Sequence, residues 1–180
     1  MKSFALCLTV LLLSICPSMA QQTQPASLLG EKMTPEADWK TFIHKDYKAI
    51  DSKVTFDRKA NTFTAMIGDT STLEKSFSYG LQIYKNIDLD QDATYEATFK
   101  TKSTVEGKLQ FRYILGKSPY HAYAAKSVDL KEGEQTHKIT FAPKAVKDTY
   151  DTPGSFRFFV GSLGKGEIEF SDLVLTQVEK

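Results

Sequence analysis

Residues 79–102 read YGLQIYKNIDLDQDATYEATFKTK, and this stretch decides the fold. It contains two runs that alternate apolar and polar side chains, 81–89 and 94–100, separated by the polar turn at 90–92. Successive side chains of a β-strand point to opposite faces, so a period of two residues predicts strands. Each run should therefore be a strand that is buried on one side.

The two faces of these runs differ in chemistry. The face expected to join the core bears Leu81, Ile83, Ile87, Tyr95, Ala97 and Phe99. The opposite face of the first run bears two amides and a phenol, at Gln82, Tyr84 and Asn86. The pattern therefore predicts a sheet with an apolar inner face and a polar, aromatic outer face.

The same alternation continues from residue 49 almost to the C-terminus. The other expected strands are Lys53–Asp57, Thr62–Ile67, 108–116, 126–130, 135–141, 155–161 and 167–177. No long helical period, internal repeat or linker interrupts them. Many short strands with closely spaced turns are typical of a single all-β sandwich of two antiparallel sheets, which we assign to residues 39–178.

The N-terminus predicts export. Residues 1–20 carry one positive charge, an apolar segment at 4–15 and small residues before Ala20, as in a cleaved signal peptide. Residues 21–38, which are polar at first and contain Pro25, are expected to be loosely ordered. We therefore expect a secreted protein, extracellular or periplasmic, whose mature chain lacks both Cys7 and Cys16.

The charge balance gives no reason to expect a strongly charged partner. The chain has 23 Lys and Arg residues against 22 Asp and Glu residues, and the leader removes one lysine and no acid. A neutral mature chain offers no electrostatic case for nucleic acid or for an anionic membrane surface. Neither is expected as a partner.

The ordered series of local patterns resembles the carbohydrate-binding modules of families 4, 9 and 22, which are jelly rolls of the galactose-binding-like type. The matching patterns are Gln82 on its strand, Thr94-Tyr95 followed by Phe99, Pro119-Tyr120, Val128-x-Leu130, Thr140-Phe141, Phe158-x-x-Gly161 and the closing strand at 166–175. The resemblance covers roughly residues 79–175. It implies a jelly-roll fold, a polysaccharide or glycan as partner, and a structural calcium ion with Asp172 as a candidate ligand. Residues 27–33 depart from the family's usual start.

Sugars are bound by aromatic rings that stack on their C–H faces and by planar amide or guanidinium groups that bind neighbouring hydroxyls. The strands offer such groups, and the sheet order that the resemblance implies would bring them to one face. The candidate ligand-binding residues are Gln82, Tyr84, Gln110, Arg112, Arg157 and Phe159, with Tyr120 and Tyr123 from the aromatic loop at 117–123. Trp39, the only tryptophan, belongs either to the core or to this binding face.

We expect a non-catalytic module, because the residue patterns provide little for catalysis. His44, His121 and His137 lack a metal-ligand spacing, and no nucleophile motif occurs. A small jelly-roll polysaccharide lyase or hydrolase is an alternative, since Gln82-Ile83-Tyr84 is similar to the Gln-Ile-His strand of some alginate lyases. A third hypothesis is a protein-binding surface-assembly domain that uses the same face.

Overall fold

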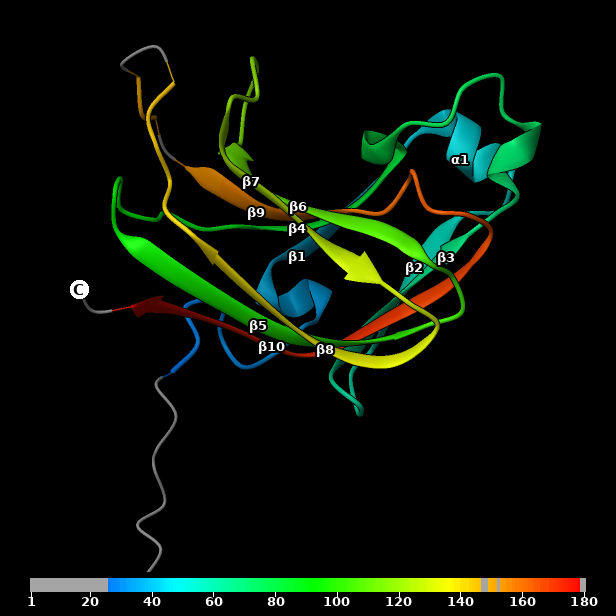
Figure 1. Cartoon of the computed structure of the whole chain (residues 1–180), viewed down its shortest axis with the longest axis horizontal. Coiled ribbons are helices and arrows are strands. Elements are labelled where there is room, and N and C mark those ends of the chain that lie inside the picture. The colour runs from blue at the N-terminus through cyan, green and yellow to red at the C-terminus, as the bar shows by residue number, and fades with distance from the viewer. Residues whose placement is uncertain (1–25, 147–148, 152, 179–180) are drawn as a thin grey trace, which may run out of the picture.

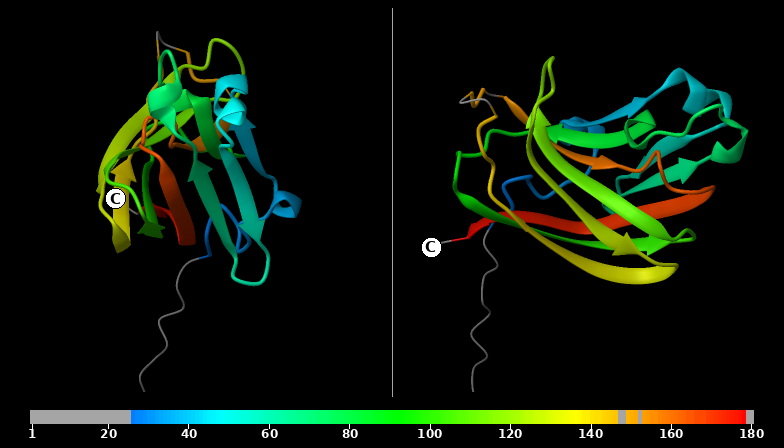
Figure 2. Two further views of the ribbon diagram at one scale, coloured as in Figure 1. Left: turned by 90° about the vertical axis from the view of Figure 1, so that its right-hand side faces the viewer. Right: turned by 45° about the horizontal axis from the view of Figure 1, so that its top comes forward.

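The computed structural model describes residues 26–146, 149–151 and 153–178, which form two five-stranded sheets packed face to face (Figures 1 and 2). Every strand pair in them is antiparallel. Sheet A consists of β1 (Trp39–Ile43), β4 (Leu81–Asn86), β9 (Gly154–Phe159), β6 (Gly107–Leu115) and β7 (Ala122–Leu130), in that order. Sheet B consists of β2 (Lys53–Asp57), β3 (Thr62–Ile67), β10 (Gly166–Val178), β5 (Thr94–Ser103) and β8 (Gly133–Phe141). The predicted all-β jelly-roll sandwich is confirmed.

The two strands of the opening stretch lie in opposite sheets. β4 pairs with β1 and β9, whereas β5 pairs with β10 and β8. The polar residues between them therefore cross from one layer to the other rather than close a hairpin. Ile83 and Phe99 are both fully buried, one from each sheet. The apolar faces of the two runs meet in one core, as the alternation predicts.

Stacked phenylalanines fill the space between the sheets. Phe63 and Phe170 stack with ring centroids 4.8 Å apart, and Phe158 contacts Phe170 at 5.0 Å. Phe111 and Phe156, on neighbouring strands of sheet A, lie 4.7 Å apart. Burying each such ring contributes about 1.5–3 kcal/mol, so this cluster is a large part of the stability of a domain without disulfides.

Trp39 belongs to this core, and the interpretation that placed it on the binding face is wrong. Its side chain is 2% exposed and packs against Phe63, with ring centroids 5.5 Å apart. The reason is its place in β1, a strand that the sequence did not reveal. Trp39 faces inward and side chains alternate along a strand, so Lys40 and Phe42 point outward.

The segment before β1 is packed, so the prediction of a loosely ordered segment is wrong for residues 26–38. Leu29 and Met33 are buried in the core, and the Leu28 amide donates a hydrogen bond to the Leu175 carbonyl over 2.8 Å. The Lys85 ammonium group donates to the carbonyls of Leu29 and Ala37, at 2.7 and 2.8 Å. Residues 1–25, with the expected leader and its cleavage site, lie outside the described residues.

The helices are short. They are η1 (Pro35–Ala37), α1 (Lys45–Ala49), η2 (Thr70–Thr72) and η3 (Ser78–Gly80). None of the helices in the described ranges has the length and apolarity needed to cross a membrane. η3 contains Tyr79 and leads directly into β4.

Candidate functional site

Sheet A arranges its outward side chains in rows, because paired residues of neighbouring strands share a face. One row contains Phe42, Gln82, Phe159 and Gln110. The next contains Lys40, Tyr84, Arg157 and Arg112. The third contains Asn86, Ser155 and Ile114. Strands β1, β4, β9 and β6 thus bring residues that are far apart in the sequence onto one surface, which we call the site face.

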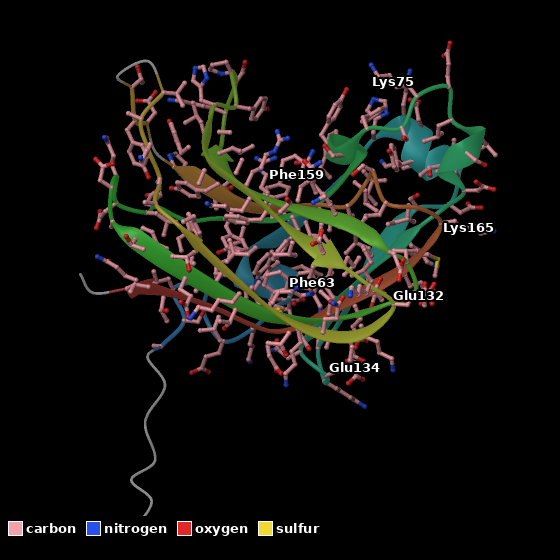
Figure 3. The ribbon with its side chains drawn as sticks, viewed as in Figure 1. Phe63, Lys75, Glu132, Glu134, Phe159 and Lys165 are labelled. Carbon is pink, nitrogen blue, oxygen red and sulfur yellow. The ribbon has the colours of Figure 1, made fainter. Side chains whose placement is uncertain are left out.

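A pocket of about 470 Å³ opens on the site face. The predicted residues that line it are Gln82, Tyr84, Arg112, Tyr120, Arg157 and Phe159. Figure 3 shows Phe159 on the outer side of the sandwich, whereas Phe63 lies between the two sheets. The volume falls in the range typical of small-molecule sites, about 300–1,000 Å³.

Arg157 lines the pocket and is held by several contacts. Its Nε donates to the Ser155 hydroxyl at 3.0 Å, and its Nη1 donates to the side-chain oxygen of Gln82 at 2.9 Å. The guanidinium carbon is 4.4 Å from the centre of the Tyr84 ring and 5.9 Å from that of Tyr120. Burial lowers the pKa of Arg157, yet a guanidinium group remains charged in proteins. The pocket therefore contains a fixed positive charge between two aromatic rings.

Arg112 is the second cation of the pocket. Its Nη2 donates to the side-chain oxygen of Gln110 at 3.2 Å, and its guanidinium carbon lies 5.1 Å from the centre of the Phe159 ring. Gln110 is on the site face but outside the pocket lining. Its contact is with Arg112, so it positions that arginine.

Gln82 connects two parts of the site. Its side-chain nitrogen donates to the Tyr79 carbonyl at 2.7 Å, while its oxygen accepts from Arg157. Both ends of the amide are thus used within the protein. Gln82 orients Arg157 and fixes the chain that carries Tyr79.

Exposed aromatic rings form the rim of the pocket. Phe42, Tyr79 and Tyr120 line it and are 43%, 54% and 55% exposed. The Tyr120 backbone has a φ of 54°, an unusual left-handed conformation for a bulky residue, and its amide donates to the Lys117 carbonyl. Backbone strain of this kind tends to occur at functional sites. Aromatic rings held open to solvent around one hollow indicate a binding surface.

The sequence reasoning missed part of the lining. The missed residues are Phe42, Tyr79, Asn86, Ile114 and Gly116. Strand alternation did place Asn86 on the outer face with Tyr84, although it was not named as a candidate, and the same alternation could have found Ile114, which shares a face with Arg112. Phe42 and Tyr79 had no such signal, since their positions depend on the pairing of β1 and on η3.

Tyr123 is not part of the pocket, and its assignment to the pocket wall is wrong. It is buried, packs 4.5 Å from the ring of Tyr150, and its hydroxyl accepts a hydrogen bond from the Asp151 amide. The cause is a bulge in the β6–β7 pairing, where Tyr113 pairs with Ala124 but Ile114 pairs with Ala122. The extra residue, Tyr123, is thereby directed into the core.

The surroundings of Asp172 do not fit a calcium site. Asp172 lies in a bulge of β10, has a φ of 50°, and its carboxylate is 2.8 Å from the Lys100 ammonium group. Across residues 26–146, 149–151 and 153–178, no three His, Cys, Asp or Glu side chains form a group that could hold a metal ion. Calcium requires about six to eight oxygen ligands, and the neighbour of this carboxylate is a cation instead.

Comparisons with known proteins agree with this geometry at the level of the fold. No protein-family model and no curated protein matches the sequence. Among solved structures, a family 4 carbohydrate-binding module matches with a TM-score of 0.64 and 20% identity, over 78% of this chain and 86% of that one. The N-terminal cellulose-binding domain of β-1,4-glucanase C from Cellulomonas fimi matches with a TM-score of 0.59 and 16% identity, over 86% of this chain and 99% of that one.

The chain has the fold of a carbohydrate-binding module. The second N-terminal cellulose-binding domain of the same glucanase also matches, with a TM-score of 0.58 and 16% identity, over 87% of this chain and 94% of that one. The predicted resemblance to modules of the family 4, 9 and 22 type is therefore confirmed for the architecture. At these identities the likeness concerns the fold, and the function has to be argued from the site face.

Proposed function

We propose that this protein is a secreted, non-catalytic module that holds a polysaccharide or glycan on the site face. The observation that carries the proposal is the pocket rim, where Phe42, Tyr79 and Tyr120 stay exposed beside two immobilised arginines. Soluble domains rarely leave several large rings exposed in one place without a partner. Rings next to planar hydrogen-bond donors are the pair of features that pyranose recognition requires.

Each part of the pocket has a role in this proposal. Tyr79 and Tyr120 stack on the C–H faces of sugar rings. Arg112 and Arg157 donate hydrogen bonds to ring substituents, and the Asn86 amide can both donate and accept. The protein makes or breaks no bond, so it acts by concentrating whatever it is attached to at a glycan surface.

A direct test combines binding with a search for products. Purified protein is applied to a panel of soluble and insoluble polysaccharides, and the supernatant is followed for new reducing ends and unsaturated ends. Retention without new ends supports the module. Unsaturated ends would instead establish the lyase alternative, and no retention on any glycan would favour a protein partner.

A rim variant links any retention to the pocket. Tyr79→Ala should weaken retention, because it removes one exposed ring. Leu28→Ala is the matched control, since Leu28 is also exposed, at 47%, but lies outside the pocket lining. Equal losses for both variants would count against the site face.

A further inference from the structure

Arg112 and Arg157 are direct partners across the β6–β9 pair. Their side chains therefore leave the sheet side by side on the site face. Like charges placed directly opposite each other in a sheet are destabilising. A carboxylate close to both guanidinium groups would offset this repulsion.

No carboxylate accompanies these two arginines in the described part of the chain. The lining of the pocket contains neither Asp nor Glu, and neither arginine forms an ion pair there. The remaining arginine of the sequence, Arg58, pairs with Glu36. On sheet B, cations also have partners, such as Lys138 with Glu96 at 2.6 Å. Of the three arginines in the sequence, Arg112 and Arg157 are thus the two without an ion pair among the described residues.

Burial raises the energetic cost of the unpaired charge on Arg157, because its side chain is only 9% exposed. Its hydrogen bonds go to a hydroxyl and an amide, and its ring contacts are with neutral phenols. These groups orient the cation without neutralising it. The hydrogen bonds use Nε and Nη1, so Nη2 has no hydrogen bond in the described part of the chain. A buried charge normally requires an opposite charge.

We infer that the glycan bound here is acidic, with an oxyanion substituent that sits against Arg112 and Arg157. This inference rests on the proposed function and adds the class of ligand. A carboxylate of a uronic acid residue or a sulfate ester supplies the oxyanion, and guanidinium groups bind both through parallel N–H donors. The neighbouring rings of Tyr84 and Tyr120 then contact the sugar that carries the substituent.

The test uses matched pairs of polysaccharides with one backbone. Polygalacturonate and alginate are each compared with their carboxyl-reduced, neutral forms, and a sulfated galactan is compared with its desulfated form. We expect the charged member of a pair to bind at least about tenfold more tightly, with an affinity that falls as salt is added. A preference for the carboxylated polymers identifies a uronate ligand, and a preference confined to the sulfated galactan identifies a sulfate ester.

Failure of the inference and failure of the proposed function give different results. Equal or tighter binding to the neutral forms would overturn the inference and leave the glycan-binding function standing. No binding to any member of the panel would overturn both. The protein concentration and buffer stay the same for the two members of each pair, so the substituent is the only variable.

Variants at Arg112 connect the preference to this pair of arginines. Arg112 is only partly buried and its sole hydrogen bond among the described residues is to Gln110, so Arg112→Gln should fold. It should reduce the preference for the charged polymer from at least about tenfold to less than about threefold, because a charge-assisted contact is lost. Arg58→Gln, which removes an arginine away from the pocket, should keep the full preference. An unchanged preference in folded Arg112→Gln would contradict the inference.

Discussion

The ring of Tyr79 stacks on that of Phe77, with centroids 4.3 Å apart, yet Tyr79 remains 54% exposed. Phe77 is itself fixed by edge contacts with His44 at 5.0 Å and Tyr47 at 5.3 Å. The Tyr47 hydroxyl accepts a hydrogen bond from the Phe77 amide and lies 2.6 Å from the Gly161 carbonyl. Tyr79 is thus a rigid platform with one face free. Rigidity before binding reduces the entropy lost when a ligand is held.

The first prediction concerns this platform. Tyr79→Ala should weaken glycan binding by about 0.5–1.5 kcal/mol, because one stacking face is lost. Its melting temperature should stay close to that of the wild type, since the ring is mostly exposed. Isothermal titration with the best-retained glycan measures the loss. Full affinity in Tyr79→Ala would exclude this ring from the contact surface.

The second prediction tests whether Trp39 acts in the hydrophobic core and not in ligand binding. Trp39→Phe should lower the free energy of unfolding by about 1–3 kcal/mol, because the smaller ring leaves a gap against Phe63 and Phe156. No hydrogen bond is lost, since the indole Nε1 has no partner among the described residues. Urea unfolding gives the stability, and titration should show unchanged glycan affinity. If Trp39→Phe instead binds glycan more weakly but unfolds at the same free energy as the wild type, Trp39 would belong to a binding surface.

The third prediction concerns the attachment of the N-terminal segment. Lys85→Met should destabilise the fold by about 1–3 kcal/mol, because the carbonyls of Leu29 and Ala37 lose their donor. Limited proteolysis should then cut residues 26–38 sooner than in the wild type. Lys53→Met, at an exposed position, is the control and should behave like the wild type. Equal cleavage rates for all three proteins would show that the Lys85 bonds do not hold the segment.

The fourth prediction is a pH dependence from His137. Burial lowers the pKa of His137, whose Nε2 lies 2.8 Å from the Thr101 hydroxyl. The unfolded chain then binds the proton more readily than the folded one, so this contribution to stability is complete above the unfolded pKa, about 6.5, and is lost as pH falls below it. Urea unfolding at about pH 7.5 and about pH 5.5 should show this loss, and His137→Gln should make it smaller. The same loss in His137→Gln as in the wild type would assign it to other groups.

Much of the sheet structure could be predicted from local alternation. The expected strands Lys53–Asp57 and Thr62–Ile67 have the observed bounds. The two-residue alternation also assigned Gln82 and Tyr84 to the outward face of their strand, and Arg157 and Phe159 to the outward face of theirs. The pleat of a single strand is enough to decide which side of the sheet each side chain takes. These strands and faces are properties of single segments. A sequence pattern can therefore reveal them.

The remaining features depend on how segments meet. The burial of Trp39 depends on the pairing of β1 with β4, and the inward turn of Tyr123 depends on a bulge between β6 and β7. Leu29 and Met33 enter the core from a segment with no strand period. Contacts between distant segments leave no periodic signal in either partner. The pocket residues Phe42 and Tyr79 were missed for the same reason.

The most direct test of the account is to map where a glycan binds, using amide chemical shifts of the labelled protein during titration with the best-retained oligosaccharide. The account predicts that the shifts concentrate on β4, β6 and β9, at Gln82, Tyr84, Arg112 and Arg157, and on Tyr79 and Tyr120 at the rim. Shifts confined to the outer face of sheet B, on β5 and β8, would contradict it.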